Sequence, residues 1–368
     1  MSDDDDDEGV VLDSLDYLMQ PLDGGSVIPV ISNSFRIEQI FREDDELIAL
    51  MSEAPQFFDE VLTFDQQLTK KWAKLIKYPM SDDHNLARVA QYQQVKSEVG
   101  AAAARQQYIK FLIDRLLKLN ENREEFKDKV AGFRKSPNPL FSKVATELEY
   151  PKFEDGFEDP LRLLAKLPLR IYITTSYSDF LERALIAENK TPITQLCFCK
   201  FGKTNIKADY LPKSDFAPTV ENPAVVHLFG LEDYPSTLVL SEDDHVNFLL
   251  NAVDALDPKA IEYPSYLRGA LSESTLLLLG YHVSGWDFRT LFRFISKIRK
   301  TESMDGDVAP SMAIQFKPSL EIKDNETLSI KYLERYFIKR NFRVRWNSTD
   351  SFVYELWNTW SMYKEPQS

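Results

Sequence analysis

The sequence has little cysteine, no long apolar run and no excess of basic residues, and each absence narrows what the protein can be. Its only cysteines, Cys197 and Cys199, cannot supply the four ligands of a structural zinc site. We therefore expect no metal site and two reduced thiols, as in a cytoplasmic protein. No window approaches the roughly eighteen apolar residues of a membrane span, and the N-terminus lacks the basic and apolar regions of a secretory signal.

The balance of charge excludes another class of partner. The net charge is −14, whereas a nucleic-acid-binding protein neutralises phosphates with lysine and arginine. We expect no direct binding to nucleic acid and none to membranes. Part of the acidity lies in the run SDDDDDEG at residues 2–9, a pattern typical of disordered tails. Residues 1–22 are predicted to be this acidic tail and the approach to a single large domain over residues 23–368.

Helical and alternating patterns divide that domain. Residues 44–150, approximately, are predicted to be a helical insertion, in which Tyr108, Leu112, Leu116 and Leu119 recur at helical spacing. Elsewhere, short apolar runs alternate with helical stretches: VIPVI, LRIYI, TQLCFCKF, VVHLFG, TLLLLGY, SMAIQFK and FRVRW. This alternation predicts an α/β fold with a largely parallel sheet and helices on both faces.

Polar residues or glycine follow four of the predicted strands. SNS follows VIPVI, TTSYSD follows LRIYI, His227 lies within VVHLFG, and GYH follows LLLL. The carboxyl ends of parallel strands share one edge of the sheet, and ligands bind in the crevice outside that edge. The sequence therefore predicts a ligand site where these four strand ends meet.

Each of these segments also has a structural interpretation. Ser and Thr in TTSYSD can cap the next helix, and Asp179 suits its positive end. Ser34 can cap the helix RIEQIF, although SNS can equally donate to a phosphate with which Arg36 pairs. His227 can be a structural hydrogen-bonding residue. In GYHVSGWDFR, Gly280 lets a nucleotide pack on the main chain, while Asp287 pairs with Arg289 or caps a helix.

Several strings together resemble the bacterial sirtuin-like family associated with defence against phage. ITTSYSDFLERAL is similar to the family's T-T-N-Y-D turn and helix, and VVHLFG to its H-x-H-G or H-x-x-G strand. LLLLGYHVSGWDFRTLF is similar to its L-G-Y-S-x-x-D-W-D-F-R segment, and TLVLSEDDHVNFL and VRWNSTDSFVYELWNTW also match. The resemblance covers roughly residues 160–360. The glycine loop of the family is degenerate here, since SNS replaces it.

The resemblance implies a Rossmann-like fold and hydrolysis of NAD to ADP-ribose and nicotinamide by an antiphage effector. It implies that His227 is the base or hydrogen-bond partner at the ribose. Ser176 stands at the family's asparagine and would orient water, while Asp179 lies one residue beyond the family's aspartate position. With two cysteines, the chain lacks the zinc ribbon of deacylases. We expect NAD to contact the strand ends: Ser32, Asn33, Ser34, Phe35, Arg36, Thr174, Thr175, Tyr177, Gly280, Tyr281 and His282.

A second function remains open. The serines at positions 176 and 178, together with the missing glycine loop, are also compatible with an inactive module that binds NAD or ADP-ribose or scaffolds a defence complex. In either case the expected partners are NAD and further copies of the chain, or a defence protein such as an ATPase or a sensor.

Overall fold

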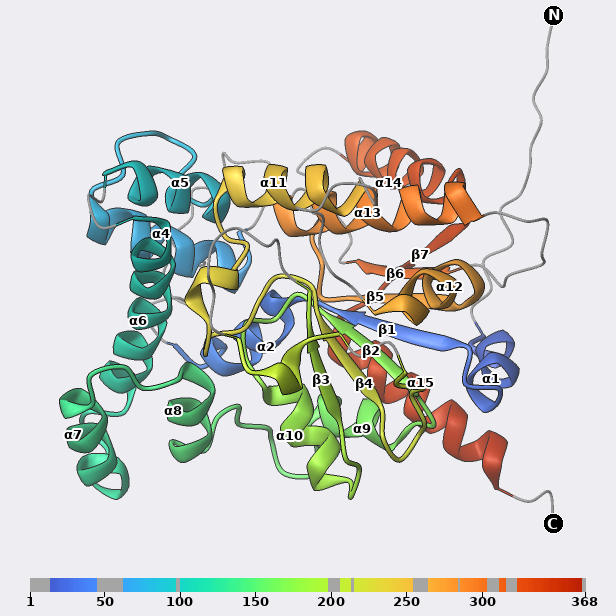
Figure 1. The fold of residues 1–368 in the computed structure, drawn as a ribbon, viewed down its shortest axis with the longest axis horizontal. Helices are drawn as coiled ribbons and strands as arrows, with labels where there is room; N and C mark the ends of the chain where they lie inside the picture. Colours follow the sequence, from blue (N-terminus) through green and yellow to red (C-terminus); the bar gives the residue numbers. More distant parts are fainter. Residues whose placement is uncertain are drawn as a thin grey trace, which may run out of the picture.

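Seven parallel strands form one sheet in the order β3-β4-β2-β1-β5-β6-β7 (Figure 1). The structure, a computed structural model, describes residues 14–44, 62–96, 100–197, 206–212, 215–253, 264–283, 285–302, 311–315 and 323–365. The strands are β1 Val27–Ile31, β2 Ile171–Thr174, β3 Ile193–Leu196, β4 Ala224–His227, β5 Thr275–Leu279, β6 Ser311–Gln315 and β7 Phe342–Trp346. The predicted α/β, Rossmann-like fold is confirmed.

Helices cover both faces of this sheet. One face carries α11 Glu242–Val253, α12 Ser265–Glu273, α13 Trp286–Glu302 and α14 Lys323–Ile338 (Figure 1). The other carries α9 Pro160–Lys166, α10 Phe180–Ala187 and α15 Thr349–Lys364. Every residue of β1 and β5 is buried, as expected for strands covered on two faces. No helix among the described residues is long and apolar enough to cross a membrane.

Pro29 is unusual because it lies in β1, the strand that holds the two halves of the sheet together. The Ile31 carbonyl accepts from Thr175 N, so the odd-numbered residues of β1 direct their backbone groups toward β2. Pairing with β2 begins only at Val30, beyond the proline. The missing N–H of Pro29 therefore costs no ladder hydrogen bond.

The helical insertion lies beyond the carboxyl ends of the strands (Figure 1). After α2 Asn33–Phe41, it contains α4 Phe64–Ile76, α5 Leu86–Lys96, α6 Ala101–Leu119, α7 Lys127–Lys135 and α8 Phe141–Glu147. Tyr108, Leu112 and Leu116 are buried, as their spacing predicts. The ring centroids of Tyr108 and Trp72 lie 5.0 Å apart. Arg105 joins this insertion to the start of α11 through Asp244.

Some boundaries differ from the sequence predictions. Residues 16–23 form helix α1, although they fall largely within the predicted tail and approach. The apolar runs TQLCFCKF and VVHLFG continue beyond the strands that they contain, which end at Leu196 and His227. Helix α13 extends through Glu302. The acidic run at 2–9, Cys199 and residues 303–310 lie outside the described residues.

Candidate functional site

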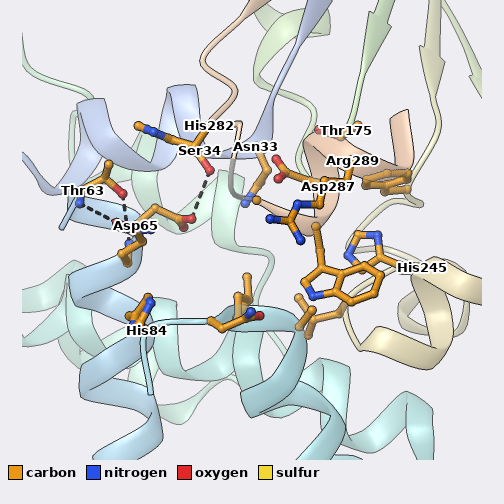
Figure 2. Close-up of a pocket in the computed structure, with 18 of the residues that line it drawn as sticks. Asn33, Ser34, Thr63, Asp65, His84, Thr175, His245, His282, Asp287 and Arg289 are labelled. Atoms are coloured by element: carbon orange, nitrogen blue, oxygen red, sulfur yellow. Dashed lines mark hydrogen bonds between the residues drawn. The ribbon is translucent and has the colours of Figure 1, made fainter. Parts of the chain in front are cut away.

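A cavity of about 230 Å³ opens at the carboxyl ends of the central strands, where the helical insertion faces the sheet (Figure 2). Figure 2 shows Ser34, Asp65, His84 and His282 on one side, and Thr175, His245, Asp287 and Arg289 on the other. All four predicted strand-end segments contribute to its lining, and VVHLFG does so through Phe229. The lining residues are Asn33, Ser34, Thr63, Asp65, Gln66, His84, Asn85, Leu86, Ala87, Thr175, Tyr177, Phe229, Leu240, His245, His282, Gly285, Trp286, Asp287 and Arg289.

The SNS segment supplies both a helix cap and part of the cavity lining. Ser32, and not Ser34, caps α2: its Oγ accepts from Phe35 N at 3.1 Å and donates to the Gly280 carbonyl. Ser34 is thereby left to line the cavity, where its hydroxyl donates to Asp65 Oδ2 at 3.1 Å. Asn33 lines the cavity beside it.

Arg36 does not line either strand-end cavity, and its expected pairing with a phosphate stays a prediction. Its Nη2 lies 3.0 Å from both carboxylate oxygens of Asp159, and its guanidinium lies over the Phe180 ring. Only 3% of the residue is exposed. The guanidinium is thus held through one nitrogen by Asp159 and by the Phe180 ring.

The TTSYSD turn contributes two of its six side chains to the cavity, Thr175 and Tyr177. The Thr175 hydroxyl lies 3.1 Å from that of Tyr281, and Tyr177 donates to the Val239 carbonyl. Thr174 is occupied within the turn and with the Ile31 carbonyl.

Ser176 and Asp179 are not brought into the cavity. Ser176 Oγ accepts from Ser178 N at 3.3 Å, so this side chain closes the turn. Asp179 pairs with Arg183 at 2.8 Å, one helical turn along α10, and makes no side-chain cap. Neither side chain lines the cavity, and their expected roles at the ribose stay predictions.

His227 lies beneath the turn, fully buried, and does not line the cavity. Its Nδ1 lies 2.9 Å from the Ser176 carbonyl oxygen and its Nε2 lies 2.8 Å from Glu182 Oε1. A carbonyl and a carboxylate only accept, so the ring needs a proton on each nitrogen. Burial is the largest single effect and opposes that charge, but Glu182, the Ser176 carbonyl and Asp179 together outweigh it and raise the pKa of His227. These contacts fix the turn, and the expected contact of His227 with the ribose stays a prediction.

Gly280 also has a packing role. Its φ is +75°, and a Cβ there would lie 2.6 Å from Phe35 Cβ and 2.7 Å from Ser32 Oγ. Its hydrogen atom therefore lets the end of β5 approach the first turn of α2. Tyr281 is buried, and His282 lies 3.7 Å from Glu38.

A second cavity of about 310 Å³ adjoins the first, and His282 lines both. It lies at the ends of β5, β6 and β7 and is bordered by apolar and polar side chains. Phe35, Glu38, Gln39, Arg42, Phe64, Gly280, Tyr281, His282, Ile314, Asn347, Ser348, Thr349 and Asp350 line it. Phe35, Gly280 and Tyr281 are thus at this cavity.

Carboxyl groups dominate the charge of the first cavity. Burial, with the nearby charges of Glu38 and Asp287, raises the pKa of Asp65 to about 7. Burial also raises the pKa of Asp287. Arg289 is an exposed cation on the rim, and no ion pair of its side chain occurs among the described residues. The cavity can therefore hold a cationic group, exchange a proton near neutral pH and contact an anion at its edge.

Sequence reasoning missed most of the insertion's share of the site. Nothing in the local pattern distinguishes Asp65 or His84 from other polar residues of a helical lobe. Asp287 was easier to single out, because it belongs to the GWDFR string. It does not pair with Arg289, and it lines the cavity. Within the described residues, no group of His, Cys, Asp or Glu has the arrangement of a metal site.

Comparisons with known proteins agree with this geometry. Residues 170–339 match the family profile described as a SIR2-like domain. Over 121 residues, the chain is 30% identical to a protein from Bacillus cereus (strain MSX-D12) named NAD(+) hydrolase ThsA. This alignment covers 33% of the chain and spans about a fifth, 21%, of the length of that relative. These matches agree with the resemblance seen in the sequence motifs: residues 170–339 are similar to a SIR2-like domain.

Proposed function

We propose that this protein binds NAD across the two adjoining cavities and hydrolyses its nicotinamide–ribose bond, giving ADP-ribose and nicotinamide. The observation that carries the proposal is the pair of cavities joined at His282. Residues that follow β1 and β5 line both cavities. The strand order reverses at β1, because β2 pairs with it on one side and β5, which follows β4 in the chain, pairs on the other. Dinucleotides bind at such a switch point of a parallel sheet. The partial similarity to an NAD(+) hydrolase supports the same ligand.

The two halves of the ligand are assigned by the chemistry of the cavities. The second cavity offers the rings of Phe35 and Phe64 to an adenine and the polar groups of its Asn347–Asp350 border to a ribose. The first cavity offers carboxyl groups, which favour the positively charged nicotinamide ring and the oxocarbenium-like state that follows. Arg289 at its rim would contact the diphosphate.

In the reaction, the bond between ribose C1′ and the nicotinamide nitrogen breaks, and its electron pair leaves with neutral nicotinamide. A water oxygen then bonds to C1′ and releases a proton. Asp65, whose pKa is about 7, accepts that proton in this scheme. Asp287 stabilises the positive charge that develops on the ribose.

Nicotinamide release tests this proposal directly. The full chain is incubated with NAD, as monomer and as any larger species separated by gel filtration, and nicotinamide is measured by chromatography. We expect release by the wild type and a decrease of about 100-fold in the Asp65→Asn variant. Asp114→Asn changes an exposed carboxylate on α6 and should leave the rate unchanged. No release from any fraction would contradict hydrolysis.

A second candidate function has its own support. Ser176 and His227, the positions at which the family resemblance put catalysis, both lie outside the cavity lining. A module that binds NAD or ADP-ribose without cleaving it is compatible with this arrangement. It predicts calorimetric binding of both nucleotides with no nicotinamide release. The antiphage role, oligomerisation and a partner ATPase or sensor stay predictions from the resemblance.

The rim arginine provides a prediction for binding alone. Arg289→Ala should weaken ADP-ribose binding about tenfold or more, because a charge-assisted hydrogen bond contributes roughly 1.5–3 kcal/mol. Arg293→Ala is the matched control, since Arg293 is exposed one turn further along α13 and does not line the cavity. Isothermal titration calorimetry measures both. Equal weakening by the two variants would point to general surface charge instead of a diphosphate contact.

A further inference from the structure

His245 faces the first cavity, and no hydrogen bond holds its ring in the described part of the chain. It lies in the first turn of α11, only 4% of it is exposed, and it lines the cavity. Its Nδ1 is buried without a hydrogen-bond partner in the described part of the chain. A buried polar atom left unpaired is uncommon and calls for a specific explanation, such as a missing ligand.

The ring is held by contacts that leave its nitrogen atoms unused. It packs edge-on against Phe229 at 5.3 Å and stacks on Trp286 at 6.0 Å between ring centroids. The preceding residue, Asp244, accepts from Leu240 N and Ser241 N and from Arg105. These bonds fix the start of α11 and, with it, the backbone that carries His245.

His245 is uncharged near neutral pH, which suits a hydrogen bond with an uncharged group of a ligand. Burial lowers the pKa of His245 to about 4, so the ring is neutral at physiological pH. A neutral imidazole has one donor and one acceptor nitrogen, which matches a hydroxyl group that also donates and accepts. An imidazolium in the same place would repel the positive nicotinamide ring and the cationic state derived from it.

We propose that His245 contacts the hydroxyl groups of the ribose that carries nicotinamide, the role that the sequence motifs had suggested for His227. This inference rests on the proposed binding of NAD. Figure 2 shows His245 across the cavity from Asp65, so a ribose between them would have the histidine on one side and the carboxyl group on the other. His245 is then a substrate-contacting residue, and Phe229 and Trp286 position it.

A purely structural role predicts a different result. If the ring only fills the space between Phe229 and Trp286, phenylalanine at position 245 would serve as well. The test therefore compares His245→Phe with His245→Gln, which retains hydrogen-bonding groups, and with Val246→Ala. Val246 is 43% exposed and is the control for disturbance of α11. ADP-ribose and AMP are titrated into each variant by calorimetry, and thermal unfolding is followed in parallel.

We expect His245→Phe to weaken ADP-ribose binding about tenfold, the effect of one lost hydrogen bond, with the affinity for AMP unchanged. AMP lacks the second ribose, so it reports the other cavity alone. His245→Gln should restore part of the loss, and Val246→Ala should bind as the wild type does. Equal losses for both ligands, or none for either, would overturn the assignment.

These titrations separate the inference from the proposed function. A wild type that binds ADP-ribose but releases no nicotinamide from NAD would contradict hydrolysis, while the ligand-specific loss in His245→Phe would still support the contact. A wild type that binds neither ADP-ribose nor AMP would overturn both proposals.

Discussion

Replacing His227 with alanine should lower the free energy of unfolding by about 3–5 kcal/mol, the cost of removing one partner of a buried ion pair. Glu182, also buried, would lose the ring nitrogen that lies 2.8 Å from its Oε1. Among the described residues, that oxygen would then accept only from the Thr194 hydroxyl. The Ser176 carbonyl would lose its donor as well. Urea denaturation of the variant and the wild type measures the difference.

The pH dependence of this loss has a defined sign. The pKa of His227 is raised above its usual value, so the folded state binds the proton more tightly than the unfolded state does. The stabilisation is therefore complete below the unfolded pKa and is lost as the pH rises through the folded pKa. The difference between wild type and His227→Ala should shrink over that interval.

Two further results separate the structural role of His227 from a catalytic one. The double variant His227→Gln, Glu182→Gln removes both charges and should recover part of the lost stability. A His227→Ala protein with wild-type stability but no nicotinamide release would instead restore the catalytic role that the family resemblance implies.

The second large effect is expected at Gly230, which follows Phe229 in the cavity wall. Its φ is +87°, and a Cβ there would lie 2.4 Å from the carbonyl oxygen of Thr237. Because the obstacle is backbone, relief requires the loop itself to move. Strain and overpacking together predict that Gly230→Ala loses about 3–5 kcal/mol of stability, measured by chemical denaturation.

Two other glycines provide matched controls. Gly156 also has positive φ, +90°, but nothing lies within 4 Å of its added Cβ, so Gly156→Ala measures strain alone. Gly269 lies in α12 with open space around it, and alanine there should stabilise the helix by about 0.5–1 kcal/mol. Similar losses at Gly230 and Gly156 would contradict the proposed clash.

The strands were predictable from the sequence because buried parallel strands are continuous apolar runs. TLLLL and VIPVI are buried throughout, and the rule that parallel strands end at one edge located the cavity. The depth of a side chain at that edge was not predictable in the same way. The sequence placed His227 at a strand end, but it did not indicate that the TTSYSD turn covers the ring or that Glu182 contacts it.

The site residues that the sequence did not reveal were hidden for a related reason. Asp65 and His245 acquire their positions from packing between the insertion and α11, which includes the contact of Arg105 with Asp244. Such contacts join residues more than a hundred positions apart, and no local spacing records them. In the SNS segment the helix cap was predictable from local sequence, but the capping residue was not. The sequence pattern favoured Ser34, whereas Ser32 caps the helix.

The central place of β1 determines how the protein can be divided. The matched SIR2-like region, residues 170–339, begins after β1 and the whole helical insertion. A fragment with only that region would hold β2 and β5 without the strand that pairs with both. Two apolar strand edges would be open to other chains, which is the condition for edge-to-edge aggregation. The region that matches the family profile is therefore smaller than the unit that can fold.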